Sequence, residues 1–143
     1  MSETTQQQAK KQVPLRPDIF TLPGPGEKPR LLGCRCPQCG EHFFPRRRIC
    51  LGCGRQGLEP AELGPRGRVS TYTIVHQKTA GSLVEPPYAI AQVRLTEGVV
   101  VQSLLTESDP AKIRCGMEVE MVLEKIGENA EKDDLIAFKF RPV

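Results

Sequence analysis

The chain has 143 residues, 38% hydrophobic and 26% charged, which suits one compact globular domain or two small ones. No apolar run approaches the length of a membrane span, so we expect no membrane partner. The net charge of +3 is uneven, because residues 28–68 carry nine Lys/Arg against three acids and the remainder carries eleven against fourteen. A basic segment beside a mildly acidic body favours an anionic partner, although solvated surface charge explains the same pattern.

Residues 1–30 are predicted to be an extended or disordered arm. Residues 1–13 are polar and include three consecutive glutamines, which favours a disordered tail. Residues 14–30 carry five prolines, and proline excludes both a helix and a central strand. Four apolar side chains in this arm require a surface that covers them, either in the same chain or on a partner subunit. The four residues, assigned here as a partner-docking arm, are Leu15, Ile19, Phe20 and Leu22.

Two Cys-x-x-Cys pairs define the next segment, residues 31–63, which we predict to be a zinc ribbon. Cys36 and Cys39 form the first pair, and after ten residues Cys50 and Cys53 form the second. This spacing is typical of a zinc site with four thiolate ligands. A glycine follows each pair directly, where the chain must turn back sharply. The four cysteines are therefore the predicted metal ligands.

Two disulfides or a redox-active Cys-x-x-Cys are the alternatives to a metal site. Disulfides need an oxidising compartment, yet residues 1–20 contain no apolar signal-peptide segment. A redox pair usually accompanies a βαβ pattern, and none follows here. We therefore expect one zinc ion per chain in a cytoplasmic protein. Because four thiolates leave no open position for water, this zinc is expected to be structural.

The other residues of the ribbon lead to narrower predictions. Cys34 lies only two residues before the first pair, so we assign it as a spare thiol outside the ligand set. Residues 43–45 are expected to form a short strand that packs against the metal site. Arg46, Arg47 and Arg48 form a basic tip between the pairs, and guanidinium groups fork onto phosphate or carboxylate. Contact with an anionic ligand or partner and plain surface charge are both open interpretations of this tip.

Residues 64–143 are predicted to be a five-stranded barrel of the OB type. The expected strands are residues 69–75, 88–95, 99–105, 118–126 and 135–141. In the last two strands apolar residues alternate with polar ones, the period-two pattern of a half-buried strand. Before the fourth strand, Asp109 is expected to cap a short helix with Pro110 in its first turn. Residues 57–68, rich in glycine and proline, are predicted to be a hinge into the barrel.

A series of short motifs runs in order through residues 31–143. They are Leu32-Gly33, Cys36-x-x-Cys39-Gly40, Phe44-Pro45-x-Arg47, Cys50-x-x-Cys53-Gly54, Gly64-x-x-Gly67-x-Val69, Tyr72-Thr73, Pro86-Pro87-Tyr88, Glu97-Gly98, Asp109-Pro110, Gly116-Met117-x-Val119 and Phe140-x-Pro142. This order resembles a family of zinc-ribbon and OB-fold proteins long classified as a domain of unknown function. The resemblance implies a mainly β fold, with an N-terminal rubredoxin-like zinc ribbon followed by a five-stranded OB-fold barrel. Where many members open with an aromatic amphipathic helix, this chain has its proline-rich arm.

Members of that family sit beside thiolases, thiolase-like ketosynthase relatives, and steroid side-chain aldolases and hydratases. The resemblance therefore implies a non-catalytic accessory subunit that completes or gates the CoA site of a thiolase-type acyl-CoA enzyme and is required for its activity. It implies a hetero-oligomer such as α2β2, with CoA or acyl-CoA at an interface that Arg46, Arg47 and Arg48 would contact. Members with a short arm and no fused hydratase include the partner of benzoylsuccinyl-CoA thiolase in anaerobic aromatic degradation.

The residues themselves contain no catalytic constellation, so we do not expect a stand-alone enzyme. There is no Ser/His/Asp arrangement, and Cys115 lacks an identifiable base and is expected to be a buried or idle thiol. Two interpretations of His76 stay open, a surface residue and a ligand-binding residue. The other alternative to an accessory subunit is a single-stranded nucleic-acid-binding OB protein. Its stacking platform would be limited to Tyr72 and Tyr88, with no Trp in the chain, so nucleic acid is not the expected partner.

Overall fold

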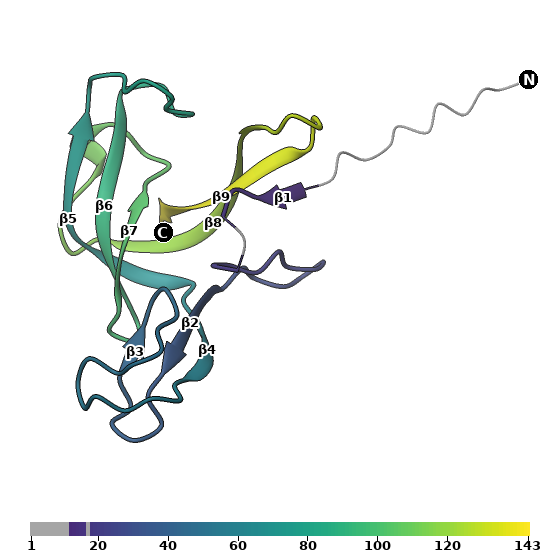
Figure 1. The fold of residues 1–143 in the computed structure, drawn as a ribbon. Helices are drawn as coiled ribbons and strands as arrows, with labels where there is room; N and C mark the ends of the chain where they lie inside the picture. Colours follow the sequence, from purple (N-terminus) through teal and green to yellow (C-terminus); the bar gives the residue numbers. More distant parts are fainter. Residues whose placement is uncertain (1–11, 17) are drawn as a thin grey trace, which may run out of the picture.

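A computed structural model describes residues 12–16 and 18–143, and these residues form two β-sheets. The smaller sheet has the strand order β3-β2-β4 and the larger one the order β1-β9-β8-β5-β6-β7. Figure 1 shows the smaller sheet at one end of the molecule, below the larger sheet, which curls on itself. The mainly β architecture predicted from the sequence is confirmed. No helix in the described ranges is long and apolar enough to cross a membrane.

The barrel strands follow the predicted segments closely. The smaller sheet contains β2 (Leu31–Arg35), β3 (His42–Phe43) and β4 (Glu59–Leu63). The larger sheet contains β1 (Gln12–Pro14), β5 (Arg66–Val75), β6 (Tyr88–Leu95), β7 (Val100–Leu104), β8 (Glu118–Glu128) and β9 (Asp134–Pro142). Alternation predicted β8 and β9, whereas β-branched residues and flanking turn residues predicted β5, β6 and β7.

The short helix before β8 is also as predicted. It is a single 3-10 turn, η1 (Pro110–Lys112), with Pro110 at its first positions. The Asp109 side chain accepts a 2.9 Å hydrogen bond from the backbone N–H of Ala111. This bond satisfies a backbone donor that the helix itself leaves free, which is the usual function of an N-cap.

The core of the barrel lies inside the curled larger sheet. Val119 and Met121 on β8 and Ile136 and Phe140 on β9 are all buried, as the period-two pattern requires. The sheet closes where the backbone N–H of Thr106 donates to the Phe140 carbonyl at 2.9 Å. Burial of an apolar side chain of this size contributes about 1.5–3 kcal/mol, so these strands supply much of the stability of the chain.

Two local predictions are wrong. Residues 57–68, expected to be a hinge, contain β4 and the start of β5. Pro60 fits in β4 because this strand lies at the sheet edge, where a missing N–H donor leaves no ladder bond unmade. The strand expected at residues 43–45 is His42–Phe43 instead. Phe44 packs against the barrel, with its ring 6.2 Å from that of Phe138 in an edge-on arrangement.

Part of the arm packs on its own chain, which is one of the two alternatives that the sequence left open. Phe20 is only 5% exposed, and its ring lies 6.0 Å from that of Phe138. Ile19 packs against the same apolar cluster. Phe20 is therefore a core residue, and a partner does not need to cover it. Leu15 and Leu22 stay exposed, so they alone keep the character predicted for a docking arm.

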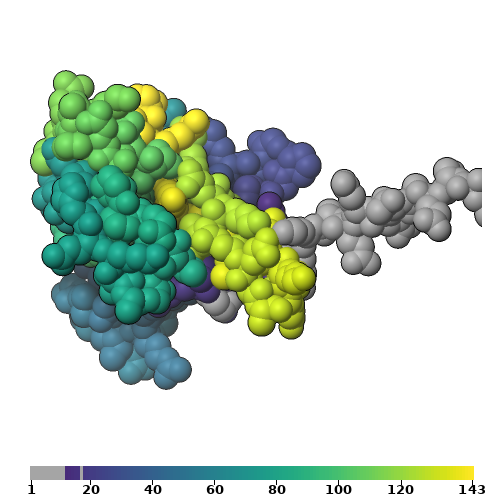
Figure 2. Space-filling model, turned by 90° about the horizontal axis from the view of Figure 1, so that it is seen from above, coloured from purple at the N-terminus to yellow at the C-terminus, as the bar shows by residue number. Residues whose placement is uncertain are grey.

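The start of the described chain is a strand, although a disordered tail was predicted there. Gln12 and Val13 pair in parallel with Asp134 and Leu135 of β9. Figures 1 and 2 show the β8–β9 hairpin reaching out beyond the barrel, and Figure 1 shows β1 along its β9 edge. Covering an edge strand in this way protects it from pairing with another chain. The prediction for residues 1–11 lies outside the described residues.

Hydrogen bonds fix the ribbon against the barrel at Gly64. The Gly64 backbone N–H donates to the Glu97 carboxylate, at 2.9 Å to the nearer oxygen. The Arg30 guanidinium donates to the Gly64 carbonyl. Glu97 lies in the turn between β6 and β7, so one turn of the barrel holds the point where the chain leaves the ribbon. The ribbon is thereby held in one orientation on the barrel.

Candidate metal centre and basic ribbon tip

The two cysteine pairs lie in turns of the same construction. The backbone N–H of Gly40 donates to the Cys36 carbonyl, and that of Gly54 donates to the Cys50 carbonyl, both at 2.9 Å. The two glycines have φ values of 80° and 76°, a left-handed conformation that side chains with a Cβ rarely adopt. The predicted function of the glycine after each pair is thus visible in the backbone. Each turn directs its two sulfurs toward the other turn.

The four sulfur atoms meet in one compact group. All lie within 4.8 Å of one another, with Cys36 Sγ 3.6 Å from Cys53 Sγ and Cys39 Sγ 3.4 Å from Cys50 Sγ. A tetrahedral zinc with bonds of about 2.3 Å holds its sulfurs about 3.8 Å apart. The four cysteines are thus positioned to bind one metal ion. In the described ranges they are the only group of three or more His, Cys, Asp or Glu side chains with this property.

The close packing of the four sulfurs gives these thiols different pKa values. Backbone N–H groups, that of Cys39 first, lower the pKa of Cys36 to about 6. The Glu41 N–H acts in the same direction on Cys39, but the neighbouring Cys50, desolvation by burial and the other two sulfurs outweigh it and raise the pKa of Cys39 to about 12. A second thiolate beside a first is unfavourable because like charges repel. A bound cation would supply the positive charge that lets all four sulfurs ionise together.

Cys34 lies outside the sulfur group but has a place in the ribbon that the sequence did not reveal. It is buried in β2, and its sulfur accepts a 3.4 Å hydrogen bond from the backbone N–H of Arg47. The thiol therefore supports the loop that carries the arginines. Spacing alone shows only that Cys34 is not part of a Cys-x-x-Cys pair, because the acceptor role depends on a loop thirteen residues away.

Gly33 sets how closely the ribbon strands approach beside the metal centre. A Cβ on Gly33 would lie 2.3 Å from the Phe43 carbonyl oxygen and 2.6 Å from Leu63 Cδ1. Real Cβ atoms essentially never come this close, so only glycine fits between β3 and β4. The residue is thus needed for the sheet that carries the first cysteine pair.

The basic tip lies on the loop after β3. Arg46, Arg47 and Arg48 are all exposed, and among the described residues no hydrogen bond or ion pair engages their guanidinium groups. Ile49 beside them is 49% exposed, and a shallow depression is lined by the arginines, Pro45 and Ile49. The tip therefore offers free positive charge next to apolar surface. Its contact with CoA or a partner stays a prediction.

The remaining candidate residues do not form a site with the cysteines. Cys115 is exposed, so of the two expectations for it, a buried thiol or an idle one, the buried thiol is wrong. It lies in the turn before β8, where Gly116 has a φ of 86°. His76 is also exposed, at the end of β5. These positions bring neither residue to the metal centre or to the basic tip.

Comparison with known proteins agrees with this arrangement. Residues 25–59 match the family model described as "ChsH2, rubredoxin-like zinc ribbon domain", and residues 61–124 match "ChsH2, C-terminal OB-fold domain". A "DUF35 domain-containing scaffold protein" of Pyrococcus furiosus is 44% identical over 119 residues, which cover 82% of this chain and 86% of that protein. The chain belongs to the DUF35 family. The predicted family, the zinc ribbon and the OB-fold domain are thereby confirmed.

Two further relatives of this DUF35 chain carry more specific names. "Benzoylsuccinyl-CoA thiolase subunit BbsA" of Geobacter metallireducens is 31% identical over 145 residues, covering 99% of this chain and 97% of that protein. Among solved structures, "Ltp2-ChsH2(DUF35) aldolase" matches with a TM-score of 0.65 and 31% identity, covering 79% of this chain and 84% of that chain. One relative is thus a subunit of a thiolase, and the other belongs to an aldolase complex.

Proposed function

We propose that this DUF35 protein is a non-catalytic accessory subunit of a thiolase-type acyl-CoA enzyme in the cytoplasm. The observation that carries the proposal is the similarity to a thiolase subunit over 99% of the chain. The partner would be a thiolase-like protein in a hetero-oligomer such as α2β2, and the substrate would be an acyl-CoA from a degradative pathway, such as that of an aromatic compound. The chain would complete or gate the CoA site of this partner.

In this proposal Cys36, Cys39, Cys50 and Cys53 hold one structural zinc ion. Four sulfurs at tetrahedral separations support this, because four thiolates fill the coordination shell and leave no position for a substrate or water. The metal would stabilise the ribbon and so position the basic tip. The acyl-transfer chemistry itself would belong to the partner, which supplies the nucleophile and base.

The proposal predicts that activity depends on both subunits. A tagged form of this chain should co-purify with a thiolase-type subunit, which mass spectrometry would identify. Once separated, this chain alone should cleave no acyl-CoA, because it has no nucleophile with a base, and the partner alone should be weakly active. Recombining them should raise thiolytic cleavage at least about tenfold, equivalent to about 1.4 kcal/mol of barrier. A partner fully active alone, or turnover by this chain alone, would contradict the proposal.

A second prediction concerns the basic tip, which we propose contacts the partner or the CoA phosphates. Changing Arg46, Arg47 and Arg48 together to Glu should weaken complex formation or CoA affinity at least about tenfold, because reversed charges repel the anionic surface that the native arginines attract. Affinity of the native complex should fall as NaCl rises, since salt screens exposed charges. Calorimetric titration with the partner and with CoA would measure both effects.

The matched control for the tip reverses three exposed charges elsewhere. A triple Lys→Glu variant at Lys78, Lys112 and Lys132 has the same net charge change as the tip variant. It should bind nearly as well as the native chain if the position of the charge matters. Equal weakening by both variants would show a general effect of net charge. Native affinity for both ligands in the tip variant would assign the arginines to solvated surface alone.

A further inference from the structure

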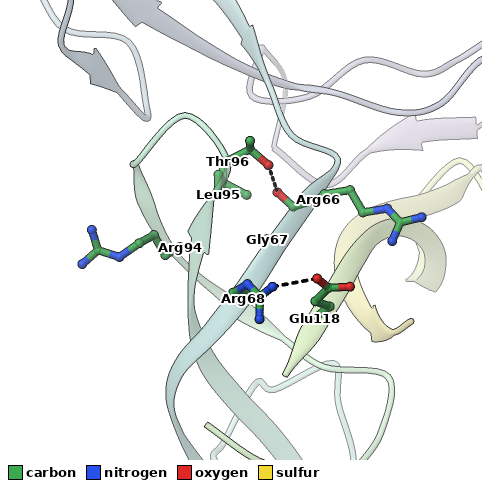
Figure 3. Close-up of a pocket in the computed structure, with 7 residues that line it drawn as sticks. All are labelled: Arg66, Gly67, Arg68, Arg94, Leu95, Thr96 and Glu118. Atoms are coloured by element: carbon green, nitrogen blue, oxygen red, sulfur yellow. Dashed lines mark hydrogen bonds and ion pairs between the residues drawn. The ribbon is translucent and has the colours of Figure 1, made fainter. Parts of the chain in front are cut away.

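A second basic surface lies on the barrel strands. A shallow depression of about 550 Å³ is lined by Arg66, Gly67, Arg68, Arg94, Leu95, Thr96 and Glu118, which come from β5, from the end of β6 and from β8 (Figure 3). Three of these seven residues are arginines. The depression has no role in binding the metal or in positioning the ribbon tip, so its charges need an explanation of their own.

Strand pairing places two of these arginines side by side. Arg68 on β5 is directly opposite Arg94 on β6. Strands β5 and β6 approach closely beside this pair because Gly67 has no Cβ. A Cβ there would lie 2.8 Å from the Arg94 carbonyl oxygen and 2.7 Å from Val93 Cγ1. Like charges directly opposite each other on neighbouring strands destabilise a sheet. This pair is therefore unfavourable for folding unless an anion joins it.

The chain supplies that anion to Arg68 but not to Arg94. Arg68 Nη2 lies 2.8 Å from Glu118 Oε1, and its Nη1 donates to the Gly116 carbonyl at 3.1 Å. The backbone of Arg94 pairs within the sheet, but its guanidinium group makes no hydrogen bond or ion pair with any described residue. Figure 3 shows its side chain extending away from Glu118. One guanidinium group on this face thus has all five donors available.

Neighbouring charges add to the positive potential. The Glu120 carboxylate is shared by three cations, with Arg66 at 3.2 Å, Lys28 at 3.5 Å and Arg141 at 4.0 Å. We call the whole set the barrel arginine patch. It consists of Lys28, Arg66, Arg68, Arg94 and Arg141 with Glu118 and Glu120. Five cations against two carboxylates leave this patch with a net charge of +3, although the barrel as a whole is nearly neutral.

Arg94, Arg68 and Glu118 form a row across neighbouring strands, and an exposed apolar side chain lies at each end of this row. Val100 on β7 is paired with Arg94 and is exposed. Val143 is 64% exposed, and its backbone N–H donates to the Glu118 carbonyl at 3.1 Å. Arginine mixed with apolar surface is typical of protein interfaces, whereas single-stranded nucleic acid needs aromatic side chains for stacking. The patch residues and their two valines include no aromatic side chain.

We propose that the barrel arginine patch docks a carboxylate-bearing surface of the thiolase-type partner, with an Asp or Glu side chain entering between Arg68 and Arg94. Charge complementarity argues for an acidic occupant, since one carboxylate there would neutralise the uncompensated guanidinium charge. The open depression suits a protruding side chain, because a small ligand usually buries most of its surface in a pocket. The inference rests on the proposed function for the identity of the partner, and it adds a contact separate from the ribbon tip.

The variant Arg94→Gln tests this docking surface by two independent measurements. The dissociation constant of the complex with the co-purified thiolase-type subunit should rise about tenfold, as at a charged hot spot. Its dependence on NaCl between 50 and 300 mM should be shallower than that of the native chain. The melting temperature of the variant should equal or exceed that of the native chain, because the repulsion with Arg68 is gone. Lys78→Gln, the same charge change at an exposed site outside the patch, should alter neither the dissociation constant nor its dependence on NaCl.

Each outcome decides the inference. Native affinity in Arg94→Gln would overturn it and leave the proposed function intact, whereas a native chain that binds no thiolase-type subunit would overturn both. A lowered melting temperature with weaker binding would indicate a structural role for Arg94 and would also overturn it. One further result would overturn the inference. If Arg94→Gln leaves the partner affinity unchanged but abolishes binding of inorganic pyrophosphate or of a single-stranded oligonucleotide, the occupant of the patch is a phosphate group.

Discussion

Replacing any one of the four paired cysteines by serine should release the metal and unfold the ribbon. The ribbon sheet has few buried residues beside its cysteines, chiefly Leu31 and Leu63, so it lacks a core of its own. Structural zinc contributes about 10–16 kcal/mol in small finger peptides, far more than such a sheet can supply. Metal content by mass spectrometry and amide hydrogen exchange in residues 31–63 would measure both losses. The barrel should keep its slow-exchanging amides, because its core lies inside the larger sheet.

The matched control for this prediction is Cys34→Ser. Cys34 is buried like Cys36 and Cys50 and lies in β2, close to the first pair, but its sulfur only accepts a bond from the Arg47 N–H. A serine oxygen can accept the same bond, so the metal content should be unchanged and the loss of stability should stay within about 1–2 kcal/mol. If Cys34→Ser lost the metal while Cys36→Ser kept it, the ligand assignment would be wrong.

The barrel strands were predictable from the sequence because each buries one face. Along β8 and β9 this requirement makes apolar and polar residues alternate in the sequence, with Val119 and Met121 buried and Glu118 exposed. The cysteine set was predictable for a similar reason, since the reach of two sulfurs toward one ion fixes their spacing. Five strands with a helical turn before the fourth then predicted the OB type. Family resemblance supplied the class of partner, which spacing and alternation by themselves do not contain.

The missed features depend on pairing between distant segments. β4 contains Pro60 and lies among turn residues, and it is a strand because β2 offers it an edge. β1 forms on β9, more than a hundred residues away, and the register of that pair has no local sequence signal. The Arg68–Arg94 pair likewise exists only through the register of β5 and β6. Tertiary pairing overrides local propensity at all these positions.

The rigid junction between ribbon and barrel bears on how the two basic surfaces would act. The tip carries Arg46 to Arg48, and the barrel arginine patch includes Lys28 and Arg66, which flank the ribbon in the chain. Because Glu97 and Arg30 both hold Gly64, the two surfaces keep one relative orientation before any partner arrives. Preorganisation of this kind reduces the entropy lost on association. Two weak contacts on one rigid body can therefore give a stable complex.

Phe20→Ala should destabilise the whole protein by about 3–5 kcal/mol, the usual cost of removing a buried phenyl ring. Phe20 is nearly fully buried, and its ring contacts Phe138, which in turn contacts Phe44 of the ribbon and Phe140 of the barrel core. The arm thus contributes one ring to a cluster that joins all three parts of the chain. Urea or thermal denaturation would measure the loss, and deletion of residues 1–30 should cause at least as large a loss.

Leu22→Ala is the matched control, because Leu22 belongs to the same arm but is 41% exposed. Its removal should change the free energy of unfolding by no more than about 0.5 kcal/mol. If Leu22 belongs to a docking surface, this variant should instead weaken the complex while the monomer keeps its stability. The opposite result at Phe20, native stability with poor complex formation, would mean that its ring leaves the core to contact the partner. Comparing the two variants therefore separates an arm that completes the core from an arm that reaches for a second subunit.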